Sequence, residues 1–183
     1  DHDTTSRLIE ENSFDFVNFT GSLRGGIEME RAAAGTFTPV GTELGGKDPG
    51  YVMEDADLDA AVETLIDGAM FNSGQCCCGI ERIYVVESLY EKFLQKAINI
   101  VENYKLGNPL EPETTLGPMA NKRFSDEVRL QINEAVELGA TAHIGVFKND
   151  DAGTYVTPQI LTGVDHNMRI MKDETFGPVV CIM

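Results

Sequence analysis

Basic side chains are scarce in this sequence. Among its 183 residues, 14 lysines and arginines stand against 30 aspartates and glutamates, which gives a formal net charge of −16. A surface this negative repels phosphate backbones and anionic lipid headgroups. Nucleic acids and membrane surfaces are therefore poor candidate partners.

Long apolar runs are also absent. No run approaches the roughly 18 residues of a membrane-spanning helix, and no charged segment followed by an apolar one opens the chain. We therefore expect a cytoplasmic protein. Apolar residues make up 42% and charged residues 24%, the balance of a globular protein, and the length suffices for one domain or two small lobes.

The two ends of the sequence are unusual for a natural chain. It begins at Asp1 without a methionine and ends in a β-branched apolar run, residues 179–183, whereas natural termini usually lie exposed. One interpretation is a C-terminal strand tied into a sheet. We favour the other, a part of a longer protein, in which 179–183 would be an unpaired sheet edge prone to association.

Strand-like and helix-like segments alternate from end to end. This pattern predicts an α/β fold in three layers with a mostly parallel sheet. The expected strands cover residues 15–20, 39–44, 51–53, 82–87, 141–144, 155–157 and 178–182. The expected helices cover residues 23–34, 58–71, 88–104, with Ser88 as its cap, and 121–138. Residues 107–118 and 148–153, rich in glycine, proline or polar residues, are expected to be loops.

Three of the four cysteines are adjacent: Cys76, Cys77 and Cys78. A zinc site needs ligand pairs spaced by a few residues, and the three histidines are scattered, so we predict no metal site. Adjacent cysteines by themselves are most often small buried apolar residues.

The residues before these cysteines favour a reactive thiol instead. A polar, turn-forming segment, 72–75, follows an amphipathic helix, so the cysteines lie on a tight loop at a helix end. A nucleophilic thiolate needs such access. Because no histidine is placed to act as its base, a carboxylate must serve.

Three runs, in order, resemble the NAD(P)-dependent aldehyde dehydrogenase superfamily. They are Glu-Leu-Gly-Gly-Lys at 43–47, Phe-Asn-Ser-Gly-Gln-Cys-Cys at 71–77 and Glu-Thr-Phe-Gly-Pro at 174–178, at separations that match the family's layout. Similar stretches at 19–22, 55–59, 107–109 and 115–118 extend the resemblance over essentially the whole sequence. One short motif is weak support, whereas this many in order are strong support.

The resemblance implies two domains and a cofactor. Residues 1–42 would be the C-terminal part of a Rossmann-like dinucleotide-binding domain, and residues 43–183 a catalytic domain, incomplete at its C-terminus. The cofactor would be NAD or NADP, the substrate a small aldehyde, and the full-length protein a homo-oligomer, dimeric or tetrameric.

The resemblance also assigns roles residue by residue. Cys77 matches the nucleophile and Glu43 the general base, while Cys78 has no chemical role. The remaining matches are to cofactor-binding positions: Gly21 and Ser22 at the pyrophosphate, Gly26 at the end of the same glycine pattern, Leu44 and Gly45 beside the nicotinamide, Glu174 on its ribose and Phe176 flanking its ring.

Chemistry gives independent reasons for these residue types. A Cys77 thiolate attacks an aldehyde carbon, and the resulting thiohemiacetal loses hydride to become a thioester. Glu43 then takes a proton from the water that hydrolyses it, a task that suits a buried carboxylate. Backbone N–H groups at a helix start attract pyrophosphate, as at Gly21 and Ser22, and Glu174 can accept from two ribose hydroxyls.

Ordinary structural roles compete with each assignment. Glu43 could be a strand-end charge, Gly21-Ser22 a common turn and Glu174 a solvated loop residue. Leu23 and Arg24 also depart from the family, which more often has a threonine and an acidic residue there. Two other functions stay open, a relative that transfers the acyl group to coenzyme A and a non-catalytic scaffold relative or fragment.

We expect the 183-residue chain alone to bind cofactor weakly and to have negligible dehydrogenase activity. It supplies no counterpart to the family's oxyanion asparagine, and losing one oxyanion donor typically costs on the order of 10² to 10³ in rate. The measurement is NADH formation with a panel of aldehydes. Turnover by the isolated chain would contradict the expectation.

Overall fold

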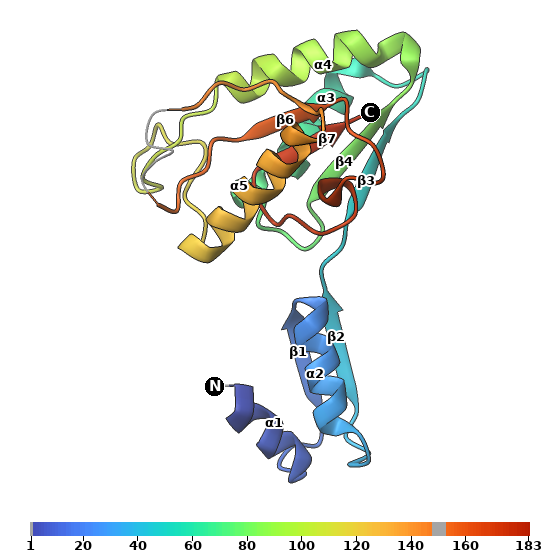
Figure 1. Cartoon of the computed structure of the whole chain (residues 1–183), viewed down its shortest axis with the longest axis vertical. Helices are drawn as coiled ribbons and strands as arrows, with labels where there is room; N and C mark the ends of the chain where they lie inside the picture. Colours follow the sequence, from blue (N-terminus) through green and yellow to red (C-terminus); the bar gives the residue numbers. More distant parts are fainter. Residues whose placement is uncertain (1, 148–152) are drawn as a thin grey trace. The chain divides into compact units, whose positions relative to one another are not determined.

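Seven strands form two separate sheets in the computed structural model, which describes residues 2–147 and 153–183 (Figure 1). The sheets belong to two compact units, Asp1–Gly45 and Gly46–Met183. No helix of the described residues is long and apolar enough to cross a membrane.

The first unit is built around a β-α-β element. Strands β1 (Val17–Gly21) and β2 (Val40–Leu44) pair in parallel, and helix α2 (Leu23–Ala33) connects them. Its small core consists of Ile9, Met29, Ala32 and Ala33. These elements confirm the predicted segments 15–20, 23–34 and 39–44. Helix α1 (His2–Glu10) is not among the predicted helices, because Leu8 and Ile9 are its only apolar residues and only Ile9 is buried.

The second unit contains a five-stranded sheet in the order β3-β4-β7-β6-β5. All neighbours are parallel except β5 and β6. The strands are β3 (Asp48–Val52), β4 (Ile80–Val85), β5 (Thr141–Ala142), β6 (Gln159–Thr162) and β7 (Val179–Ile182). The helices are α3 (Leu58–Met70), α4 (Glu87–Glu102) and α5 (Lys122–Glu137), with short 3₁₀ turns η1 (Phe71–Gly74) and η2 (Arg169–Met171).

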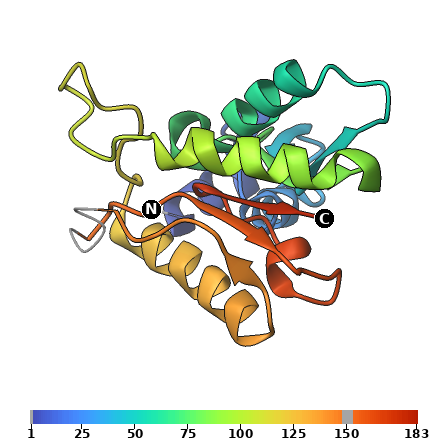
Figure 2. The ribbon, with the colours of Figure 1, turned by 90° about the horizontal axis from the view of Figure 1, so that it is seen from above.

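Helices cover both faces of this sheet, α3 and α4 on one side and α5 on the other (Figure 2). Alternate residues of the central strands supply two cores. Ile160 and Val180 pack in the cluster that includes α3 and α4, while Leu161 and Val179 pack in the cluster that includes α5. The expected three-layer α/β arrangement with a mostly parallel sheet is thereby confirmed.

Strand β7 is central in the sheet, so the expectation of an unpaired edge at 179–183 is wrong. Cys181 pairs with Arg82 of β4 on one side and with Leu161 of β6 on the other. The β-branched run is buried because both neighbouring strands and both helical layers enclose it.

Further predictions differ from the structure, and strand β3 begins at Asp48, three residues before its predicted start. Residues 155–157 are not a strand, because side chains and not a neighbouring strand bond to this segment: Arg129 donates to the Tyr155 carbonyl. The strand β6 begins after Pro158. Strand β4 begins at Ile80, two residues before its predicted start. Ser88 is not the cap of α4, which begins at Glu87. Of the predicted loop 148–153, residues 148–152 lie outside the described residues.

Candidate active site

The amino ends of three neighbouring strands lie at the same end of the second unit's sheet. Strands β3, β4 and β7 are adjacent and parallel, so the segments that precede them lie on the same side. Lys47 immediately precedes β3, Cys77 precedes β4 and Glu174 precedes β7. Sheet topology therefore brings together residues that are far apart in the sequence.

The segment leading to Cys77 has a left-handed backbone. Asn72, Ser73 and Gly74 have φ values of 51°, 57° and 70° in succession. Residues other than glycine avoid this region, asparagine least, so the loop stores conformational strain. Strain of this kind persists only where surrounding structure holds it, and it gathers at functional sites.

Hydrogen bonds hold residues 72–78, the cysteine loop, in place. The buried Ser73 hydroxyl donates to the Gly117 carbonyl at 2.7 Å. Asn72 and Gln75 donate from their side-chain amides to each other's carbonyls at 3.1 and 3.0 Å. The Ala120 N–H donates to the Gln75 side-chain oxygen at 2.7 Å. The predicted loop 107–118 thus buttresses the cysteine loop.

The four thiols differ in access and acidity. Cys77 and Cys78 are exposed, Cys76 is partly buried and Cys181 is 1% exposed. The Sγ atoms of Cys76 and Cys78 lie 3.4 Å apart, and this hydrogen bond, with the charges of the neighbouring thiols, raises the pKa of Cys78. Burial raises the pKa of Cys181 to about 12. Cys77 is exposed and takes no part in the hydrogen bond between Cys76 and Cys78.

The cysteine loop packs against the Glu174 loop through two glycine backbones. A Cβ atom added at Gly74 would lie 2.0 Å from the Gly177 carbonyl oxygen. No side chain fits between the two backbones at that distance. The loops of Cys77 and Glu174 are therefore in direct contact.

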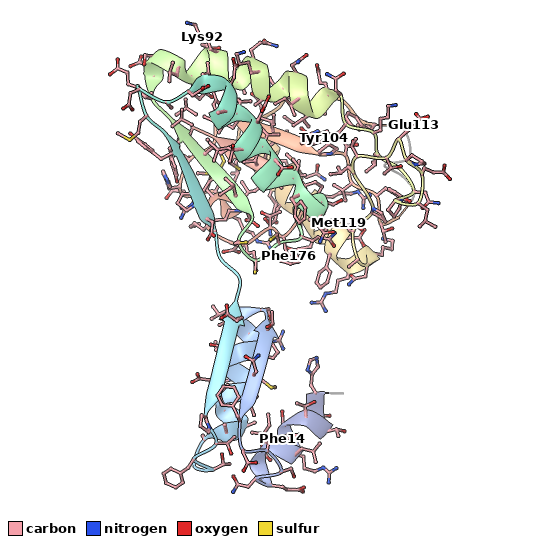
Figure 3. All side chains as sticks on the ribbon, turned by 180° about the vertical axis from the view of Figure 1, so that it is seen from behind. Phe14, Lys92, Tyr104, Glu113, Met119 and Phe176 are labelled. Carbon is pink, nitrogen blue, oxygen red and sulfur yellow. The ribbon has the colours of Figure 1, made fainter. Side chains whose placement is uncertain are left out.

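Glu174 and Phe176 lie on the segment between η2 and β7. Phe176 is 36% exposed with a φ of 52°, and its ring lies at the surface of the second unit (Figure 3). Burial raises the pKa of the half-buried Glu174 and the negative charge of Glu81 adds to the shift, while a Gly46 hydrogen bond and the charge of Lys47 oppose it.

Two charged residues near these loops had no role in the sequence analysis. Lys47 and Glu81 form an ion pair at 2.5 Å, with side chains 7% and 6% exposed. One signal could have found Glu81: in Ile80–Val85 it is in phase with the buried Ile83 and Val85. The predicted strand began at Arg82, so this glutamate fell outside it.

The first unit holds the other predicted positions. Gly21 ends β1, and Ser22 is the N-cap of α2, where its hydroxyl accepts from the Gly25 N–H at 3.2 Å. Gly26 packs against Leu44, since a Cβ there would lie 2.8 Å from a Leu44 methyl group. Beside these residues is a pocket of about 480 Å³, open to solvent, lined by Leu23, Gly26, Ile27, Glu30, Arg31, Ala34, Thr42 and Leu44.

Glu43 lies on β2, paired in register with Thr20, and its side chain is exposed. It belongs to the first unit, which ends at Gly45, whereas the expected boundary fell between residues 42 and 43. The reason is that pairing between β1 and β2 continues to Leu44. The burial that suits a general base is not provided within this unit.

Histidines and metal ligands take no part in this arrangement. The ring of His143 is hydrogen-bonded to the Thr162 hydroxyl at 2.7 Å and that of His166 to Tyr84 at 2.8 Å. Within residues 2–147 and 153–183, no group of three or more histidine, cysteine or acidic side chains is placed to hold a metal ion.

Comparison with known proteins identifies the family. The model of the aldehyde dehydrogenase family matches residues 1–183, so the chain belongs to this family. It is 40% identical over 169 residues to an aldehyde dehydrogenase of Davidiella tassiana, covering 92% of this chain and 34% of that protein. It is also 40% identical over 170 residues to human aldehyde dehydrogenase 1A1, at the same coverage. The chain thus spans about a third of the length of these relatives.

Solved structures agree on the fold. A mutant aldehyde dehydrogenase from Bacillus cereus matches with a TM-score of 0.91 and 34% identity, over 98% of this chain and 37% of that one. Betaine aldehyde dehydrogenase from Staphylococcus aureus, in complex with NAD⁺, matches with a TM-score of 0.91 and 33% identity, over 98% of this chain and 36% of that one.

We predict that brief treatment of the native chain with iodoacetamide labels Cys77 first. Cys78 should react more slowly because its pKa is raised, and Cys181 should react only after unfolding because it is buried. Peptide mass spectrometry gives the site of labelling, and labelling in denaturant is the control. Equal labelling of Cys76, Cys77 and Cys78, or labelling of native Cys181, would contradict this order.

We predict that Gly74→Ala lowers the free energy of unfolding by about 2 to 4 kcal/mol, because left-handed strain and a backbone clash add together. Gly153→Ala is the matched control, since its φ is 75° and a Cβ there meets no described atom within 4 Å. That variant should lose only about 1 to 2 kcal/mol, from strain alone. Denaturant titration measures both, and equal losses would refute the loop contact.

Proposed function

We propose that the protein oxidises an aldehyde to a carboxylate with NAD or NADP, with Cys77 as nucleophile. One observation carries the proposal. An exposed thiol lies on a strained, hydrogen-bonded loop, and the backbone of this loop contacts the loop that carries Glu174. A strained loop held this firmly suits a preorganised nucleophile better than an ordinary surface turn.

Each unit by itself offers residues that a dinucleotide cofactor would use. In the first unit, a mostly apolar pocket along α2 offers a surface for a flat ring, and the start of this helix suits a pyrophosphate. The residues that would hold this half of the cofactor, and the part of the cofactor that follows it, are Gly21, Ser22, Gly26, Leu44 and Gly45. In the second unit, Glu174 would accept from ribose hydroxyls and Phe176 would flank the nicotinamide. The NAD⁺ complex of the Staphylococcus aureus neighbour supports a cofactor of this type.

Different residues of the chain would carry out different steps of the reaction. The Cys77 thiolate attacks the aldehyde carbon and forms a carbon–sulfur bond, which gives a thiohemiacetal. A bound dinucleotide would supply the hydride acceptor, and loss of hydride would convert the thiohemiacetal into a thioester on Cys77. Glu43 takes a proton from the attacking water, the carbon–sulfur bond breaks, and the carboxylate leaves.

The test is turnover by the intact gene product with an aldehyde panel and each cofactor. Cys77→Ser should lower kcat by at least about 10³-fold, because the weaker nucleophile forms no competent intermediate. Glu43→Gln should lower kcat by about 10²- to 10⁴-fold yet leave a burst of NADH, because hydrolysis and not acylation loses its base.

Cys76→Ser is the matched control, since it changes a neighbouring thiol with no proposed chemical role, and it should leave kcat within about threefold of the native value. Full activity in Cys77→Ser would overturn the proposal. A product released only when coenzyme A is added would replace it with acyl transfer to that thiol.

A further inference from the structure

Glu81 is a buried carboxylate whose two oxygens both accept hydrogen bonds from a single short segment. The Thr175 N–H lies 3.1 Å from Oε1 and 2.9 Å from Oε2, and the Phe176 N–H lies 2.9 Å from Oε1. Lys47 Nζ completes the set, 2.5 Å from Oε2. The carboxylate therefore links the start of β4 to the N–H groups of two consecutive peptide bonds, Glu174–Thr175 and Thr175–Phe176.

A wider network fixes the same segment from α5. Lys47 Nζ donates to the Thr175 hydroxyl at 2.9 Å, and that hydroxyl donates to Gln131 Oε1 at 2.7 Å. Gln131 Nε2 donates to the Glu174 carbonyl at 3.4 Å. Three consecutive residues are thus held through the Glu174 carbonyl and the next two N–H groups.

Stability alone does not explain a buried ion pair at this place. Removing two charges from water costs about as much as their attraction returns, and well-packed apolar residues often serve equally well. The pair instead fixes the position of the backbone at residues 174–176, because both carboxylate oxygens face backbone donors. The geometry matters here because Phe176 keeps a left-handed backbone that non-glycine residues avoid.

We propose that Glu81 is a positioning residue, which holds residues 174–176 in the conformation that presents the Glu174 carboxylate to the ribose diol on the nicotinamide side of the cofactor. The proposal rests on the proposed function. Glu81 touches no substrate in this scheme and acts only through the backbone of the Glu174 segment. Lys47 supports it by neutralising the buried charge.

The test compares two nucleotides in the intact gene product. The variant is Glu81→Gln combined with Lys47→Met, which removes both buried charges and leaves one acceptor oxygen for the two N–H groups. It should raise the dissociation constant for the dinucleotide about tenfold. ADP lacks the nicotinamide ribose, so its dissociation constant should stay within about twofold.

Ile83→Val is the matched control, because it weakens the core on the same face of β4 and removes none of the hydrogen bonds to the Glu174 segment. It should leave both dissociation constants unchanged. Equal affinity for the dinucleotide in the native protein and the double variant would overturn the inference, as would an equal loss for ADP. No dinucleotide binding by the native protein would instead overturn the proposed function.

A measurement on the native chain keeps the inference open to refutation should the double variant not fold. The Thr175 and Phe176 N–H groups should exchange with deuterium as slowly as those of central strand β7, because buried acceptors hold them. Exchange as fast as in the exposed loop around Leu110 would overturn the inference.

Discussion

The parallel pairing of β4 with β7 is the constraint on which the candidate site depends. It places the segments before the two strands side by side, although Cys77 and Glu174 are far apart in the sequence. The contact is close because Gly74 and Gly177 have no side chains to separate the backbones. Ligand sites in open parallel sheets usually lie at the carboxyl ends of strands, whereas the candidate site lies at the amino ends.

Side-chain hydrogen bonds to the backbone hold both loops of this region. The cysteine loop is held by Ser73 and Gln75, and the Glu174 segment is held by Glu81 and Gln131. Buried hydrogen bonds are directional, so they can fix a backbone in a strained conformation that apolar contacts would let relax. Burial, and after it the negative charge of Glu81, raise the pKa of the half-buried Glu174.

Much of the fold was predictable from local signals. The helix 121–138, the Gly21-Ser22 turn at the start of α2 and the alternation of strands with helices are all local features. The two errors about strands at 155–157 and 179–183 have a common origin, because pairing partners are not visible in the sequence. Residues 155–157 have strand-like composition but no strand neighbour, and the apolar run at the end of the chain is a central strand.

By itself, the sequence determined the family, the identity of the candidate nucleophile and the main secondary structure, because motifs and hydrophobic periods are local. Only the tertiary structure decided that Cys77, among three adjacent thiols, is the exposed one with neither a thiol hydrogen bond nor burial against it. It also showed that Glu81, a residue with no motif of its own, lies beneath the Glu174 segment. The physical reason is that burial and hydrogen-bond partners depend on which strands become neighbours, and long-range pairing alone settles that.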